Sequence, residues 1–305
     1  MASRSSASGP PQSAAPSAPA LILSRDNKWL KEFRMAIRGG LPTESGAVGV
    51  EGPRLVEEAL RSGCAVRAVL FSESGQRHHA RFGTYLDRSR VAIPILHTTD
   101  RLFLGIADTE QPQGVAALVT PRTFSLADIS ASGVAGAAPL VVVLVGVQDP
   151  GNVGTILRTA AAFGATAAVT AASGQGGTAS PFSPKSLRAS AGAALHLRLL
   201  AGISLPLLLE EFRAREIRTL ASSSREAQAG RGPLVAPWEV DWRAPLALLI
   251  GNEGQGLPEE IASSADAAIR IPMSASVESI NAAAAAAVLL YEASRQRRSP
   301  ARQIP

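Results

Sequence analysis

The chain has 305 residues, 46% of them hydrophobic, and this length and composition fit one large globular domain or two modest ones. The formal net charge of +5, from 30 Lys and Arg against 25 Asp and Glu, is compatible with a polyanionic partner without requiring one. The single cysteine, Cys64, excludes an intrachain disulfide, and the longest apolar run, residues 139–147, is too short to cross a bilayer.

Residues 1–22 are mostly Ser, Ala and Pro without apolar periodicity, which predicts a disordered tail. Residues 23–121 alternate short β-type runs with helical patterns, which predicts a first α/β unit. Its expected helices are 27–37, 53–62 and 98–106, and its expected strands are 47–52, 66–71, 91–96 and 114–119.

An Ala-, Gly- and Ser-rich segment, residues 122–138, is expected to link this unit to a second one over residues 139–296. The second unit opens with an apolar run that is typical of a strand buried on both faces of a parallel sheet. Its expected strands are 140–147, 165–171, 218–222, 246–250 and 268–272, and its expected helices are 155–163, 205–216 and 281–294. Residues 297–305 are expected to form a basic tail.

Three polar segments follow the carboxyl ends of predicted strands, where open α/β sheets bind their ligands. They lie within GVQDPGNVGTILRTAAAFGA (146–165), LLIGNEGQGLP (248–258) and IRIPMSASVESINAAAAAAVLLYE (269–292). Each segment alone also fits an ordinary turn: Asn152, Ser279 and Asn281 are good helix caps, and glycines are common in loops.

In this order and spacing, the three segments together resemble the motifs of the SpoU (TrmH) family of RNA ribose 2′-O-methyltransferases, in the SPOUT superfamily. The runs VGVEGPRLVEEALRSGCAVRAVLF (48–71) and PQGVAALV (112–119) resemble the family's substrate-binding domain. The resemblance implies S-adenosylmethionine-dependent methylation of a ribose 2′-OH in RNA, either ribosomal or transfer RNA.

The fold implied by this resemblance is α/β: a SPOUT domain with a mostly parallel, trefoil-knotted sheet, preceded by a smaller ribosomal-protein-like α/β domain. Gly251, Ile271 and Ile280 would contact S-adenosylmethionine through backbone and apolar surface. The resemblance also implies a cytoplasmic homodimer with the site close to the subunit interface. No metal is needed, because the sulfonium carries its own positive charge.

The family pattern assigns activation of the 2′-OH to Arg158, and positioning roles to Asn152, Glu253, Ser279 and Asn281. An arginine stays protonated at neutral pH, so a literal base role would need strong perturbation or a relay through a substrate phosphate. None of the four histidines falls in a motif, which argues against catalysis by histidine.

Two groups of basic and polar residues are candidates for contacts with the RNA backbone. Lys185, Arg188 and Ser190 lie in a segment that matches a family region near the RNA site, and Lys28, Lys31 and Arg34 lie on the first predicted helix. For both groups the alternative is an ordinary solvated charged surface.

Two other functions remain open at this stage. A non-catalytic RNA-binding protein that kept the fold would have lost motif residues, yet all five polar positions are present. A SPOUT enzyme that methylates a base is also conceivable, although such relatives carry other motif residues.

Overall fold

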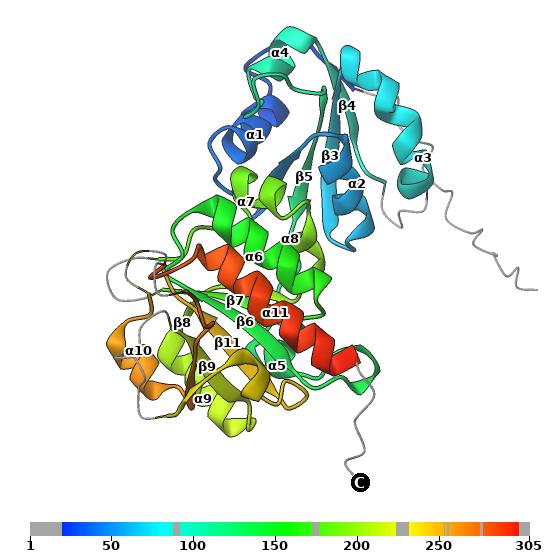
Figure 1. The fold of residues 1–305 in the computed structure, drawn as a ribbon. Coiled ribbons are helices and arrows are strands. Elements are labelled where there is room, and N and C mark those ends of the chain that lie inside the picture. Colours follow the sequence, from blue (N-terminus) through cyan, green and yellow to red (C-terminus); the bar gives the residue numbers. More distant parts are fainter. Residues whose placement is uncertain are drawn as a thin grey trace, which may run out of the picture.

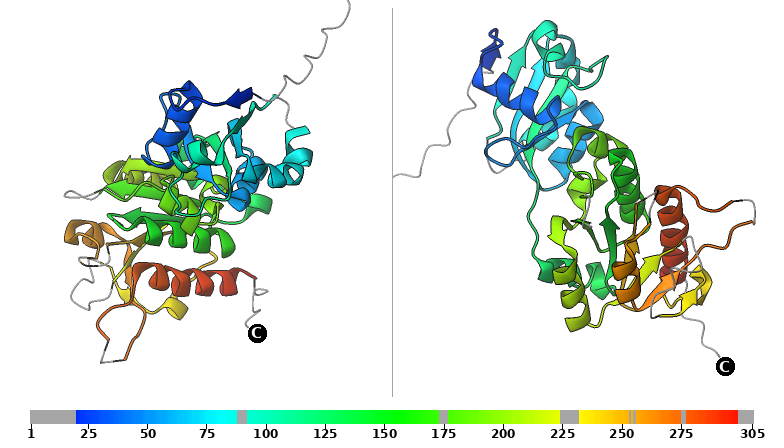
Figure 2. Two further views of the ribbon diagram at one scale, coloured as in Figure 1. Left: turned by 90° about the horizontal axis from the view of Figure 1, so that it is seen from above. Right: turned by 90° about the vertical axis from the view of Figure 1, so that its left-hand side faces the viewer.

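The computed structural model describes residues 20–87, 92–172, 177–223, 232–252, 254, 256–274 and 277–298. They form two α/β domains that lie end to end, each built on its own sheet (Figures 1 and 2). Residues 1–19 of the predicted tail lie outside the described residues. Residues 20–22, which were also assigned to that tail, instead form a strand that pairs with the first sheet.

The first domain has a five-stranded mixed sheet with the order β1-β4-β3-β5-β2. Its strands are β1 (Ala20–Ile22), β2 (Val48–Glu51), β3 (Ala65–Ser72), β4 (Ile95–Thr98) and β5 (Val115–Thr120). Its helices are α1 (Lys28–Ile37), α2 (Pro53–Arg61), η1 (Ser74–His78), α3 (His79–Asp87) and α4 (Asp100–Leu104). The strand predicted at 91–96 is displaced towards the carboxyl end, and α3 was not predicted.

The segment predicted as a linker is partly structured. It contains α5 (Leu126–Ser130), whose amino end has a reciprocal capping box between Ser125 and Asp128, and the short helix η2 (Val134–Gly136). Ile129 of α5 is fully buried against the second sheet. Small residues made this segment look like a linker, but its apolar positions are sufficient to attach it to the second domain.

The second domain has a seven-stranded sheet with the order β10-β12-β9-β11-β6-β7-β8, and every described neighbouring pair runs parallel. Its strands are β6 (Leu140–Val145), β7 (Ala167–Ala172), β8 (Leu199–Ser204), β9 (Arg218–Ser222), β10 (Leu234–Val235), β11 (Leu246–Ile250) and β12 (Ala267–Ile269). Its helices are α6 (Pro150–Ala162), α7 (Pro184–Ala189), α8 (Ala193–His196), α9 (Leu205–Ala214), η4 (Pro237–Glu239), α10 (Glu259–Ser264) and α11 (Ala282–Arg298).

Helices cover both faces of this sheet, as the apolar first strand predicts. Val142 and Leu144 of β6 belong to the core beneath α6 and α11, whereas Val141 and Val143 belong to the core beneath α5 and α9. Figure 2 shows α11 and α9 on opposite sides of the strands. All six residues of β6 are buried, so the prediction of a strand covered on both faces is confirmed.

Helix α6 begins at Pro150, five residues earlier than predicted. Asp149 is its N-cap, because its carboxylate accepts a hydrogen bond from the Gly151 amide at 3.0 Å. Pro150 suits the first helical position, where no amide donor is needed. Asn152, predicted as a possible cap, therefore lies in the first turn of α6 and is not its N-cap.

Gly154 allows α6 and α7 to pack unusually close together. A Cβ at this position would lie 2.4 Å from the Ser186 carbonyl oxygen and 2.6 Å from the Ala189 Cβ. We expect Gly154→Ala to lower the free energy of unfolding by about 1–3 kcal/mol through overpacking. Gly83→Ala is the matched control, since Gly83 is also helical but its Cβ would face open space. Chemical denaturation should show the control unchanged or slightly stabilised; equal effects would contradict the close packing.

The end of α11 differs from the predicted basic tail. Residues 297 and 298 form the last turn of this helix. The Arg297 guanidinium donates hydrogen bonds to four backbone carbonyls, those of Ala138, Pro139, Trp242 and Ala244. Arg297 is therefore a structural residue that joins the end of α11 to the segments leading into β6 and β11.

Candidate active site

The centre of the second sheet contains a topological switch point between β6 and β11. From β6 the chain continues to β7 and β8 on one side, whereas β11 and β9 lie on the other. The loops after β6 and β11 meet at the carboxyl edge, where the Asn252 side-chain amide donates to the Gly146 carbonyl oxygen at 2.9 Å. Such a crevice is where open parallel sheets bind ligands.

The loop after β11 folds tightly onto itself. Asn252 and Gly256 exchange two backbone hydrogen bonds of 3.1 and 3.0 Å, and a Cβ on Gly251 would lie 2.4 Å from the Gly256 carbonyl carbon. Only glycine fits at position 251. Asn252 was not singled out from the sequence, although its place between glycines after a buried strand was the available signal. Glu253 lies outside the described residues.

The first and third motifs meet directly. The Asn281 side-chain amide donates to the Asn152 side-chain oxygen at 3.1 Å. The Asn281 side-chain oxygen accepts from the amides of Ala283 and Ala284, so this residue caps α11 and contacts α6 at once. Ser279 is exposed and does not cap α11, so only Asn281 fulfils the predicted capping role.

Arg158 lies two turns further along α6 and is exposed. Its six-residue separation from Asn152 corresponds to about 9 Å along the helix axis. Within the described ranges, its guanidinium makes no hydrogen bond or ion pair. The structure therefore leaves this charge available to a ligand and does not place it in contact with the asparagine pair of the same chain.

Of the three predicted phosphate contacts beside α6, only Lys185 keeps a mostly exposed side chain. Lys185 forms an ion pair with Asp149 at 2.6 Å, and this hydrogen bond, with that from the Gly151 amide, lowers the pKa of the Asp149 carboxyl. Arg188 instead forms an ion pair with Asp108 of the first domain at 2.7 Å. Ser190 is fully buried and donates to the Leu187 carbonyl oxygen, so the prediction of a phosphate contact there is wrong.

The basic residues of α1 are engaged to different degrees. Lys28 and Lys31 make long ion pairs with Glu32 and Asp26, at 3.9 and 3.8 Å, and both side chains remain exposed. Exposed pairs of this kind contribute little to stability, so both charges remain accessible to a polyanion. Arg34 donates to the Gly105 carbonyl oxygen at 3.4 Å, which connects α1 to the end of α4.

The carboxyl edge offers backbone and apolar surface that fits S-adenosylmethionine. Gly251 is buried where the β11 loop folds back against its own backbone, and Ile271, half-buried, follows β12. Ile280 is 37% exposed and Val277 is 44% exposed, which is unusual for side chains of this type. These features suit a cofactor with an adenine ring and an aliphatic chain.

The described part of the chain holds no group of three or more His, Cys, Asp or Glu side chains arranged to bind a metal ion. No helix within the described ranges has both the length and the apolar character needed to span a bilayer.

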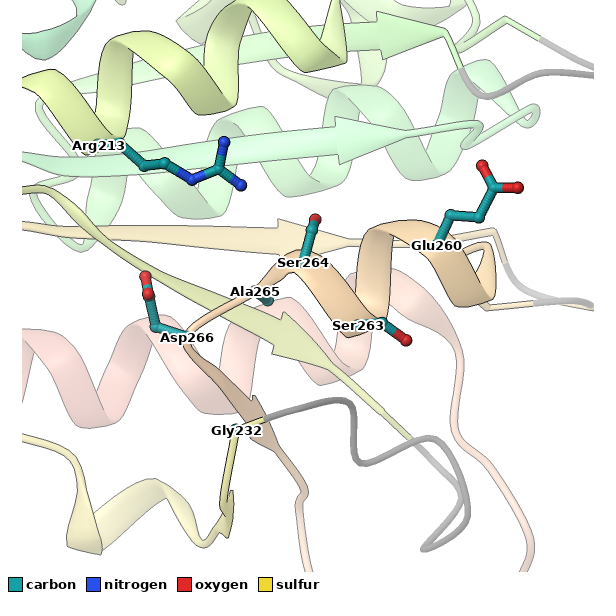
Figure 3. Close-up of a pocket in the computed structure, with 7 residues that line it drawn as sticks. All are labelled: Arg213, Gly232, Glu260, Ser263, Ser264, Ala265 and Asp266. Carbon is teal, nitrogen blue, oxygen red and sulfur yellow. The ribbon is translucent and has the colours of Figure 1, made fainter.

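A separate hollow of about 520 Å³ lies between α9 and α10 (Figure 3). It is lined by Arg213, Gly232, Glu260, Ser263, Ser264, Ala265 and Asp266. Asp266 lies just before β12 and bonds to Thr219 near the start of β9, so this end of the hollow is at the amino edge of the strands. It contains none of the predicted catalytic or cofactor-binding residues.

Comparison with known proteins agrees with this architecture. Residues 139–291 match the SpoU rRNA Methylase family, and residues 43–117 match the MRM3-like substrate binding domain. An uncharacterized tRNA/rRNA methyltransferase of Synechocystis sp. is 33% identical over 91% of this chain and 94% of its own length. The 23S rRNA (guanosine(2553)-2′-O)-methyltransferase RlmP of Bacillus subtilis is 29% identical over 88% and 97%. The AdoMet-bound rRNA methyltransferase of Sinorhizobium meliloti superposes with a TM-score of 0.74 at 28% identity, covering 92% and 98%.

The protein is thus an RNA methyltransferase that uses S-adenosylmethionine. It belongs to the SpoU rRNA Methylase family. The predictions of this family, of the α/β fold class, of a ribose 2′-O-methyltransferase and of its cofactor are confirmed.

Proposed function

We propose that this chain methylates a ribose 2′-OH of ribosomal RNA, at a site on the carboxyl edge of β6 and β11. The observation that carries the proposal is the hydrogen bond between Asn152 and Asn281, which unites the first and third motifs beside the β11 loop. Transfer RNA is the second candidate, since the Synechocystis relative is named for both RNAs. Because ribosomal RNA is the proposed substrate, we place the protein in the cytoplasm.

The proposed mechanism assigns binding and orientation to the residues of the site. The backbone at Gly251, with Ile271 and Ile280, would hold S-adenosylmethionine, which supplies an electrophilic methyl group when bound. We propose that the third motif passes through a trefoil knot to complete this cradle. The backbone turns of such a knot would exclude water from the transferred methyl group.

Arg158 is the proposed essential residue for the substrate. Its exposed guanidinium can bind the RNA phosphate next to the target ribose, and that phosphate can accept the proton that the 2′-OH loses. Asn152 and Asn281, together with Glu253 and Ser279, would orient the ribose. Lys28, Lys31 and Lys185 are the proposed contacts to the RNA backbone, because their side chains stay exposed.

Transfer of label from isotopically labelled S-adenosylmethionine tests the proposed reaction. The protein is incubated with ribosomal or transfer RNA, and mass spectrometry of the nuclease digest locates the label. A labelled 2′-O-methylnucleoside in ribosomal RNA is the expected result. Label on a base, or only in transfer RNA, would contradict the proposed substrate atom or RNA, and absence of both label and cofactor binding would favour a non-catalytic role.

We further propose that the protein is a homodimer in which α6 and α11 face the second copy. The two helices pack side by side, and their outer surface carries Ala284, Val288 and Tyr291, the last two being 43% and 58% exposed. Tyr291 also packs edge-on against Phe163 at the end of α6. Small and apolar side chains on paired helices permit a close, self-complementary contact, and Arg158 on α6 would then lie near the subunit interface.

Tyr291→Arg is expected to convert the dimer to a monomer, since it buries an unpaired charge at the centre of the proposed interface. Val134→Arg is the control, because Val134 is an exposed apolar residue on η2, outside α6 and α11. In sedimentation velocity, Tyr291→Arg should sediment with the mass of a monomer, and Val134→Arg should keep the mass of the dimer. A dimer that survives Tyr291→Arg would place the interface elsewhere.

A further inference from the structure

Helices α7 and α8 lie between the two sheets, although they belong to the second domain by chain order (Figure 1). Leu187 of α7 and Leu195 of α8 are buried in the same continuous hydrophobic cluster as Val48 and Leu55 of the first domain. The two domains therefore share apolar core through this segment, which we call the α7–α8 segment (residues 184–196). A shared core restricts hinge motion, because packed interiors are close to crystal density.

Gly192, between α7 and α8, lies close against helix α2 of the first domain. Gly192 has φ +84°, and a Cβ there would lie 2.8 Å from the Glu58 Cβ and 3.2 Å from Leu55 Cδ1, both on α2. Contacts below 3.0 Å force a neighbour to move. Helix α2 therefore lies directly on the backbone of the α7–α8 segment, and only glycine fits.

Polar contacts flank this close approach on both sides. Arg188 pairs with Asp108 at 2.7 Å, and His196 Nε2 lies 2.9 Å from a Glu58 carboxylate oxygen. Arg122 also donates to the His196 carbonyl oxygen at 2.7 Å. Partly exposed pairs of this kind contribute little to stability. Their main effect is to specify the orientation of the first domain on the α7–α8 segment.

The opposite side of the α7–α8 segment is attached to the helix that carries the site. Ser186 donates to the Pro150 carbonyl oxygen at 3.1 Å, and Lys185 pairs with Asp149. Together with the close packing at Gly154, these contacts hold α7 against the first turns of α6. A continuous packed path therefore runs from α2 through the α7–α8 segment to α6, which bears Asn152 and Arg158.

We infer that the α7–α8 segment is a rigid spacer that sets which ribose reaches Arg158, with Gly192, Arg188 and His196 as positioning residues. The inference rests on the proposed function: RNA held by the first domain presents a ribose at a fixed distance and direction from α6. If the spacer shifts, the RNA still binds, but the target ribose is misplaced. A displacement of about 1 Å is enough to reduce a rate by about 100-fold.

Gly192→Ala compared with Gly63→Ala tests the spacer. Both glycines have positive φ, +84° and +75°, so both substitutions carry the same kind of backbone strain. Only the Gly192 variant meets α2, whereas the Cβ of the Gly63 variant faces open space. With ribosomal RNA, Gly192→Ala should lower kcat at least about tenfold and spread the label to neighbouring nucleotides, while the dissociation constants of RNA and S-adenosylmethionine change less than about twofold. Gly63→Ala should keep the wild-type kcat and a single labelled nucleotide.

A charge-reversal pair provides a second test that does not depend on how Gly192→Ala folds. Arg188→Asp and Asp108→Arg should each lower kcat without weakening RNA binding, and the double variant should restore it. Unchanged kcat in all variants, or loss of RNA affinity in proportion to kcat, would overturn the spacer.

Calorimetry of the wild-type protein separates this inference from the proposed reaction. A shared core predicts one cooperative unfolding transition for both domains, and two independent transitions would overturn the rigid spacer even in an active enzyme. Absence of label with the wild-type protein would instead refute the proposed function. In that case a single unfolding transition would still show that the two domains share one core.

Discussion

Replacing Arg158 with alanine is expected to reduce the rate of methyl transfer about 10²- to 10³-fold, which is the usual effect of losing one group that stabilises developing charge. The free energy of unfolding should change by less than about 0.5 kcal/mol, as for other surface substitutions. The structure explains this separation, because Arg158 is exposed and makes no hydrogen bond or ion pair within the described ranges. Removal of the Arg158 side chain therefore leaves the packing of α6 unchanged.

Arg218→Ala is the matched control for this experiment. Arg218 is also exposed, but it starts β9 at the amino edge of the sheet, away from the three motifs. Both variants lose one positive charge, so any general loss of attraction to RNA is shared. Initial rates of label transfer at saturating cofactor should fall only for Arg158→Ala. Equal rates for the two variants would mean that Arg158 is not part of the site.

The position of the candidate site could be predicted from the sequence, because parallel strands all end at the same edge of a sheet. All three polar segments follow predicted strands, and parallel strands bring their carboxyl ends to one edge. The contacts of Asn281 with Asn152, and of Asn252 with Gly146, realise that expectation. Which asparagine makes which contact was not predictable, since it depends on where α6 begins and on the path of the β11 loop.

The differences from the sequence-based predictions concern burial and contacts between segments that are distant in the chain. Arg188 reads as a solvated cation until the first domain brings Asp108 to it, and Ser190 looks like any polar residue of a basic loop. Residues 122–138 predict a linker between the two domains, but the sequence did not predict that the α7–α8 segment packs both domains into one continuous core. Local composition carries no information about such docking, because it is decided by shape across the interface.

Arg297 is another residue whose role depends on segments that are distant in the chain. Its place among the cations at the end of the chain predicts a tail residue, yet its guanidinium binds four carbonyls from the two segments that lead into β6 and β11. Burial lowers the pKa of Arg297, because the charged form loses contact with water. The residue is therefore retained at an energetic cost that its hydrogen bonds must offset.

Arg297→Met is expected to lower the free energy of unfolding by about 2–4 kcal/mol. Methionine keeps much of the aliphatic packing but leaves the carbonyls of Ala138, Pro139, Trp242 and Ala244 without their donor. The loss is smaller than the sum of four hydrogen bonds to a charged group, because the burial cost of the guanidinium disappears with it.

Arg298→Met is the control, since Arg298 is the next residue of α11 and is exposed. Urea denaturation should shift the unfolding midpoint clearly for Arg297→Met and hardly at all for Arg298→Met. At urea concentrations below the unfolding transition, Arg297→Met should still transfer label. The Arg297 hydrogen bonds lie at the amino ends of β6 and β11, whereas the proposed site lies at their carboxyl ends. Equal midpoints for the two variants would show that water replaces Arg297 as the hydrogen-bond donor to the four carbonyls. The end of α11 would then be held by its apolar face alone.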